Sequence, residues 1–135
     1  MDVPILLTAD YANVANDGKL NVMGIFTNIK AFSFPALHPQ MYLIAQLSGG
    51  RAEYNRKFKL EIKLLNEDAT LEVVNRIAEA QLPQGENGQL VNLNIILSLS
   101  NIVFPTPGTY EFSILVDNDV KGTLPLEIIL IAQDQ

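Results

Sequence analysis

The sequence has no cysteine, no tryptophan and only one histidine among its 135 residues. The lack of cysteine excludes thiol nucleophiles, cysteine-ligated zinc and iron–sulfur clusters. One histidine cannot supply the several ligands that a catalytic zinc site normally draws from histidine or cysteine. We therefore expect a protein that is not an enzyme and that carries no cofactor.

Basic residues are also scarce, because nine Lys and Arg face 15 Asp and Glu, giving a formal net charge of −6. This sign is wrong for binding nucleic acid or an anionic membrane surface, so neither partner is expected. Long apolar runs are missing too: the stretch 124–132 contains Glu127 and is far shorter than the roughly 20 residues of a spanning helix. Asp2 stands where a signal peptide needs positive charge. We expect one cytoplasmic domain covering residues 1–135, since this length suits a single domain.

Apolar residues recur with a period of two. Phe58, Leu60, Ile62 and Leu64 alternate with polar residues and predict one buried face of a strand. Two further segments follow the same rule, with the apolar sets Tyr110, Phe112, Ile114, Val116 and Leu93, Ile95, Leu97, Leu99. In the latter segment Ile96 lies on the opposite face, which predicts partial cover there.

Turn signals separate these runs at strand-like spacing, beginning with Asp17-Gly18, a strong hairpin signal. About eight strands result. Because each sheet has one apolar face that must be covered, we predict an all-β, two-sheet antiparallel sandwich, compatible with an immunoglobulin-like or Greek-key topology. Residues 68–82 are ambiguous: their apolar positions fit a helical face, but the preceding strand needs an antiparallel neighbour, so a strand is favoured.

The segments Ala9-Asp10-Tyr11-Ala12 and 18–26 (Gly-Lys-Leu-Asn-Val-Met-Gly-Ile-Phe) resemble the opening of a family of uncharacterised bacterial proteins. Its members carry A-D-x-A followed by G-K-L-N-x-x-G. The segment 107–112 (Pro-Gly-Thr-Tyr-Glu-Phe) is similar to the family's closing P-G-x-Y-x-F element. The resemblance implies a β-rich bacterial domain of unknown function and supplies no activity.

The residues that carry this resemblance also have structural interpretations. Gly18 suits the positive φ of a tight hairpin, and Gly24 within a strand predicts a bulge or a close backbone approach. Tyr110 is expected in the core with its hydroxyl bonded to backbone. Asp10, an acid within an apolar strand, is expected at an exposed edge or bonded to a loop.

A hard-cation site is one functional hypothesis. If strands simply alternate in direction, the loops with Asp17, Asp117 and Asp119 gather at one end of the sandwich, and calcium binds six to eight oxygens. Lys19 and Lys121 lie in the same loops and could neutralise the acids instead. Ordinary solvated turn residues are the favoured interpretation.

His38 is the only candidate base near neutral pH, and it lies between Leu37 and Pro39. We interpret it as an exposed loop residue. An enzyme using His38 would instead require a concave pocket with an Asp or Glu within reach.

Leu115, Ile129 and Ile131 would point away from the core if alternation holds, which indicates a partner surface. The favoured function is therefore a non-enzymatic binding or assembly module that self-associates through its C-terminal strands or binds a protein partner. The alternative is a small-ligand or calcium-binding domain using the acidic loops.

Overall fold

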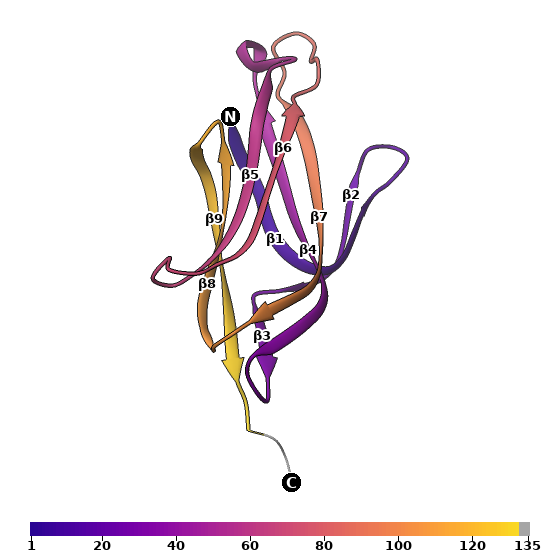
Figure 1. The fold of residues 1–135 in the computed structure, drawn as a ribbon. Coiled ribbons are helices and arrows are strands. Elements are labelled where there is room, and N and C mark those ends of the chain that lie inside the picture. The colour runs from indigo at the N-terminus through magenta and orange to yellow at the C-terminus, as the bar shows by residue number, and fades with distance from the viewer. Residues whose placement is uncertain (133–135) are drawn as a thin grey trace.

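The computed structural model describes residues 1–132, and within them it contains nine β-strands and a short 3-10 helix. The strands form two layers (Figure 1), ordered β2-β1-β4-β7 in a four-stranded sheet and β3-β9-β8-β5-β6 in a five-stranded sheet. Their bounds are β1 Asp2–Val14, β2 Leu20–Phe26, β3 Asn28–Ala31, β4 Ala36–Gly49, η1 Arg51–Glu53, β5 Lys57–Asn66, β6 Glu72–Gln81, β7 Val91–Phe104, β8 Gly108–Val116 and β9 Asp119–Leu130. The predicted all-β sandwich is confirmed.

The strand that the sequence did not predict is β3. It has four residues and pairs in parallel with β9. Four residues give too little alternation to distinguish a strand from a loop. The ambiguous segment 68–82 forms β6, paired antiparallel with β5, so the favoured strand interpretation is confirmed. Within residues 1–132 there is no helix of the length and hydropathy needed to cross a bilayer.

The strand order is that of an immunoglobulin-like sandwich: β1-β4-β7 correspond to A-B-E and β9-β8-β5-β6 to G-F-C-C′. Tyr110, near the start of β8, is buried and donates a hydrogen bond to the backbone carbonyl of Thr106 at 2.8 Å. This is the tyrosine corner of such folds. The expected placement of Tyr110 is confirmed.

The main core lies between the sheets. The alternating residues predicted from the sequence fill it: Phe58, Leu60, Ile62 and Leu64 of β5 are buried, as is the corresponding set of β8. Of the set predicted on β7 only Leu99 is fully buried, while Leu93, Ile95 and Leu97 pack on the core and stay partly exposed. The core is thus partly open to solvent along β7 from Leu93 to Leu97.

A second apolar cluster covers the outer face of the four-stranded sheet. The β1–β2 hairpin projects from this face in Figure 1, and its Ala12, Leu20 and Val22 pack with Ile44 and Ile96. Asn94 of β7 donates a side-chain hydrogen bond to the carbonyl of Gly18 at 3.4 Å. The partial cover predicted for Ile96 is confirmed.

Candidate functional site

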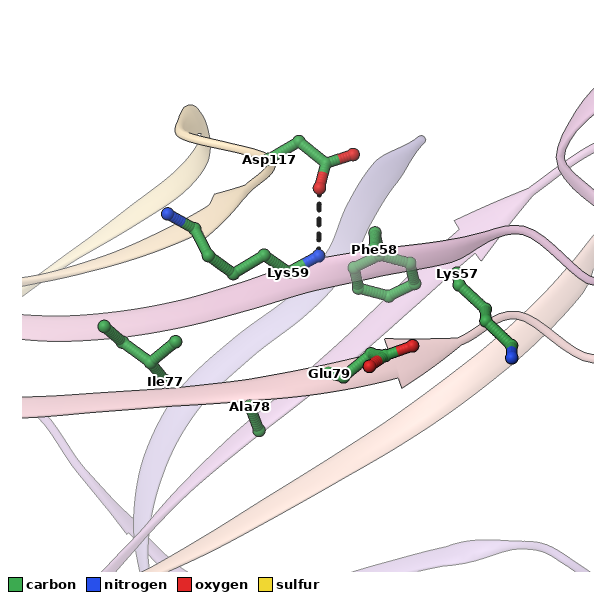
Figure 2. Close-up of a pocket in the computed structure, with 7 residues that line it drawn as sticks. All are labelled: Lys57, Phe58, Lys59, Ile77, Ala78, Glu79 and Asp117. Atoms are coloured by element: carbon green, nitrogen blue, oxygen red, sulfur yellow. Dashed lines mark hydrogen bonds between the residues drawn. The ribbon is translucent and has the colours of Figure 1, made fainter.

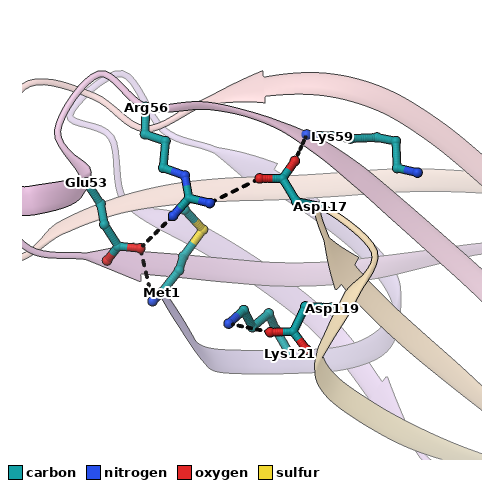
Figure 3. A network of polar contacts seen from close by, with 7 residues as sticks. All are labelled: Met1, Glu53, Arg56, Lys59, Asp117, Asp119 and Lys121. Carbon is teal, nitrogen blue, oxygen red and sulfur yellow. Dashed lines mark hydrogen bonds and ion pairs between the residues drawn. The ribbon is translucent and has the colours of Figure 1, made fainter.

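One end of the sandwich carries a network of ion pairs (Figure 3). The Glu53 carboxylate accepts from the Met1 amine at 3.1 Å, and Arg56 reaches Asp117 at 3.1 Å. Asp117 also accepts from the backbone N–H of Lys59 at 2.9 Å. The hydrogen bond from the Met1 amine lowers the pKa of Glu53, and that from Lys59 N–H, helped by Arg56, lowers the pKa of Asp117. The network joins the β4–β5 and β8–β9 connections.

The predicted metal ligands do not converge. Asp17 at the β1–β2 hairpin tip pairs with Lys19 at 3.6 Å, and Asp119 pairs with Lys121 at 3.0 Å. Within residues 1–132, no group of three or more His, Cys, Asp or Glu side chains could hold a metal ion. Each of the three carboxylates instead forms an ion pair with a lysine or arginine. This agrees with the alternative interpretation, in which basic residues of the same loops neutralise the acids.

The predicted partner-surface residues also lie apart. Leu115 faces Val120 across the β8–β9 pairing, while Ile129 lies nine residues further along β9, opposite Lys30. At about 3.3 Å per residue this is roughly 30 Å. Ile131 follows the end of β9 near Ala31. All three side chains are half-buried and do not form one patch.

A depression of about 530 Å³ lies on β5 and β6 (Figure 2). Two lysines line it, and Figure 2 shows the Lys57 and Lys59 ammonium groups pointing to opposite sides. Asp117 is engaged by Arg56, and the Lys59 ammonium donates to the Asn118 side chain. The charged groups of this depression are therefore spread along a solvated face and do not converge on one point.

The interpretation of His38 as an exposed loop residue is wrong. It lies in β4 opposite Ile102, half-buried, and its Nε2 is buried with no hydrogen-bond partner. It lines a depression of about 300 Å³ together with Asp10 and Lys30. Burial lowers the pKa of the imidazole, while the Asp10 carboxylate and the Gln40 backbone oppose this shift. A depression at His38 with an acidic residue in its lining is what an enzyme using His38 would require. Its lining contains no serine or threonine that could act as a nucleophile.

Two residues that carry the family resemblance, Asp10 and Gly24, lie against each other beside this depression. Gly24 has φ +71, and a Cβ there would lie 2.4 Å from the Asp10 carboxylate oxygen. The close approach predicted for Gly24 is thus confirmed, and Asp10 is exposed, as expected. Gly18, with φ +84, forms the hairpin turn. These residues shape the hairpin.

Three of the sheet edges found among residues 1–132 carry features that discourage further strand pairing. The edge strand β6 has Glu72, Arg76 and Glu79, and Arg76 shares the inward face with its partner Ile62. The edge strand β2 is short and irregular at Gly24. On the far edge of the five-stranded sheet, β3 has only four residues, and the part of β9 beyond it carries Lys121 and Pro125. Charge, proline, shortness and irregularity are the usual protections of an edge.

The fourth edge, β7, lacks these protections from Val91 to Ser100, before the irregular residue Asn101 with φ 55. Its 14 residues, Val91–Phe104, include no charged residue and no proline. In the described part of the chain its pairing partner is β4, which leaves the backbone groups of its other side free. We call this side, from Val91 to Ser100, the β7 edge. Sequence alone shows the absence of charge, but not that the strand is outermost.

Comparison with known proteins identifies the chain. The profile of the family of unknown function DUF6941 matches residues 4–129. The chain therefore belongs to this family. No curated protein matches the sequence.

Among solved structures, the chain is similar to the Pseudomonas fluorescens alkylpurine DNA glycosylase AlkC bound to DNA containing an abasic site analog, with a TM-score of 0.58 and 11% sequence identity. The match covers 95% of this chain and 30% of the glycosylase chain. At this identity the likeness concerns the fold alone. The chain corresponds to less than a third of that protein's length.

Proposed function

We propose that this DUF6941 domain is a non-enzymatic binding module that receives a β-strand of a protein partner at the β7 edge. The observation that supports this is the contrast among the edges: β7 is the longest and has no charge, while the others are charged, short or interrupted. A free edge offers unpaired N–H and C=O groups, and an added strand satisfies them.

The half-exposed core residues next to the edge strengthen the proposal. Leu93, Ile95 and Leu97 face the core, yet remain partly accessible because the sandwich is open along β7. A strand added beside β7 would place its own inward side chains against them. Burial of apolar area and formation of backbone hydrogen bonds would then stabilise the same complex.

The proposal differs from the sequence hypothesis in its surface. Self-association or protein binding is kept, but the C-terminal strands are replaced by β7, since Leu115 and Ile129 lie far apart. We also propose that the protein is cytoplasmic. The absence of cysteine is compatible with this location.

A charge placed on β7 tests the proposal. Ser98 is exposed on the outer face of β7, so Ser98→Lys adds an ammonium group to the edge without entering the core. The matched control is Ile77→Lys on the already charged edge β6, where Ile77 is 61% exposed. The probe is a labelled peptide with the sequence of Val91–Ser100 and lysines at both ends.

We expect saturable peptide binding or self-association by the wild type, at least tenfold weaker binding by Ser98→Lys, and wild-type behaviour by Ile77→Lys. Fluorescence anisotropy measures the first and sedimentation velocity the second. The proposal is overturned if Ser98→Lys changes neither peptide binding nor the sedimenting mass. Circular dichroism confirms that each variant is folded.

A further inference from the structure

We infer that the strand occupying the β7 edge belongs to a second copy of this chain, antiparallel about a two-fold axis at Ile96. The inference rests on the proposed strand-binding function and names its partner. It would join two four-stranded sheets into one continuous sheet.

The length of the regular part of β7 places the two-fold axis near the middle of the β7 edge. The β4–β7 register runs without a shift from Gly49–Val91 to Ala36–Phe104, but the pair of Pro39 with Asn101 is missing from it, and Asn101 has φ 55, so the extended backbone of β7 is interrupted there. The regular part of β7 therefore ends at Ser100. Its middle lies between Ile95 and Ile96, so an axis at either residue uses almost the whole edge.

The two faces of β7 favour the axis at Ile96. Ile96 lies on the outer face with Asn92, Asn94, Ser98 and Ser100, whereas the inward face carries leucine and isoleucine. An axis at Ile96 places Asn94 opposite Ser98, Asn92 opposite Ser100, and Ile95 opposite Leu97. Moving the axis to Ile95 or Leu97 places Ile96 opposite Asn94 or Ser98. Cross-strand neighbours of like polarity stabilise a sheet, so the register at Ile96 is preferred.

The charges favour a second copy over an unrelated strand. A foreign partner is usually selected through complementary charges, and β7 offers none over 14 residues. Two copies of β7 meet without like charges facing each other, although each chain carries a net charge of −6 elsewhere. A two-fold arrangement uses the same edge on both chains, so assembly closes at two.

The absence of native cysteine makes the register testable by single-cysteine cross-linking. Residues directly opposite in an antiparallel pair have Cα atoms about 4.5–5.5 Å apart, within the range for a disulfide. Asn94→Cys and Ser98→Cys are prepared separately and oxidised alone or as an equimolar mixture. With the axis at Ile96, residue 94 of one copy faces residue 98 of the other, while like residues lie about four positions apart.

We expect a covalent dimer at twice the 14.9 kDa chain mass in the mixture only, once the two variants have exchanged chains. Neither variant alone should cross-link, and Ile77→Cys on β6 mixed with either should not. Melting temperatures close to that of the wild type establish that the variants are folded, and Asn92→Cys mixed with Ser100→Cys provides a second pair.

The failures are distinguishable. If the wild type sediments as a monomer at high concentration but binds the β7 peptide, the second-copy inference is overturned and the proposed function stands. If a dimer forms and Asn94→Cys or Ser98→Cys cross-links alone, the axis is wrong. If a dimer persists unchanged in Ser98→Lys and the peptide does not bind, the proposed function fails as well.

Discussion

The edge strands β6 and β7 lie on the same side of the sandwich, at the ends of different sheets. Their sequences differ in the charged residues that would discourage pairing with another strand. Within β6, three of ten residues are charged, and Arg76 shares the face of the buried Ile62. In β7, none of 14 residues is charged. Both strands are paired on one side only among residues 1–132.

Burial does not explain the composition of β7. An inward charge on an edge strand discourages pairing with another chain, and so do exposed Lys and Glu. β6 has these features while its inward Val74 still packs in the core. β7 could carry charge on its outer face at equal cost, because Asn92, Ser98 and Ser100 are exposed there. Its lack of charge therefore fits a strand that is covered in the working protein.

Removing the charges from β6 should have the largest effect. We expect the triple variant Glu72→Gln, Arg76→Gln, Glu79→Gln to form assemblies larger than a dimer, because a second unprotected edge lets the chain pair on two sides. Light scattering against concentration measures this.

A matched triple variant in loops, Lys19→Gln, Glu67→Gln, Glu86→Gln, changes the net charge equally and should behave as the wild type. If both triple variants assemble alike, net charge and not the β6 edge is responsible. If neither does, charge is not what protects β6.

The third edge strand, β2, is irregular at Gly24, whereas β6 carries charges. A substitution at Gly24 measures what maintains this irregularity. Gly24→Ala should destabilise the fold by about 1–2 kcal/mol from the left-handed backbone alone. A clash adds to this, since the new Cβ would lie 2.4 Å from the Asp10 carboxylate oxygen. Urea unfolding measures the loss.

The Asp10→Ala background separates the two contributions, because the clash disappears there and the backbone cost remains. Gly50→Ala is the control, since nothing lies within 4 Å of a Cβ at Gly50 and its φ of −100 suits alanine. An equal loss for Gly24→Ala in both backgrounds would show that Asp10 does not restrict this position.

Much of the fold follows from the sequence because alternation reports which face a residue occupies. Phe58, Tyr110 and Gly24 could be placed on this basis. Alternation does not report which strands are neighbours, so the outermost position of β7 was not predictable. His38 was misplaced because the flanking prolines suggested a loop, whereas Pro39 lies inside β4 at the single position where the β4–β7 pairing lacks a pair. The gathering of loops was predicted only in part, since the β1–β2 hairpin folds over the sheet and takes Asp17 to β7.

Two tyrosine hydroxyls hold the connections before and after β7, and they should differ in energy. Tyr110 donates to Thr106 after β7 and is buried, whereas Tyr54 donates to Gln89 before β7 and is more exposed. Tyr110→Phe should cost about 1 kcal/mol, as for a buried hydrogen bond, and Tyr54→Phe less. Thermal unfolding measures both. Dimer mass should be unchanged in either variant, and a lost dimer would show that β7 depends on these anchors.

The smallest effect concerns pH, because β7 has no titratable side chain while the fold contains His38. Burial lowers the pKa of His38 from its ordinary 6.5, so below pH 6.5 the unfolded chain binds more protons than the folded one. The stability due to neutral His38 is present above pH 6.5 and is lost as pH falls through the lowered folded pKa. Asp10 and Lys30 line the same depression. We expect urea midpoints to fall from pH 7 to pH 5 in the wild type and less in His38→Gln, while the dimer fraction stays constant. A dimer that dissociates over the same range would place a titrating group, and hence a different strand, at the interface.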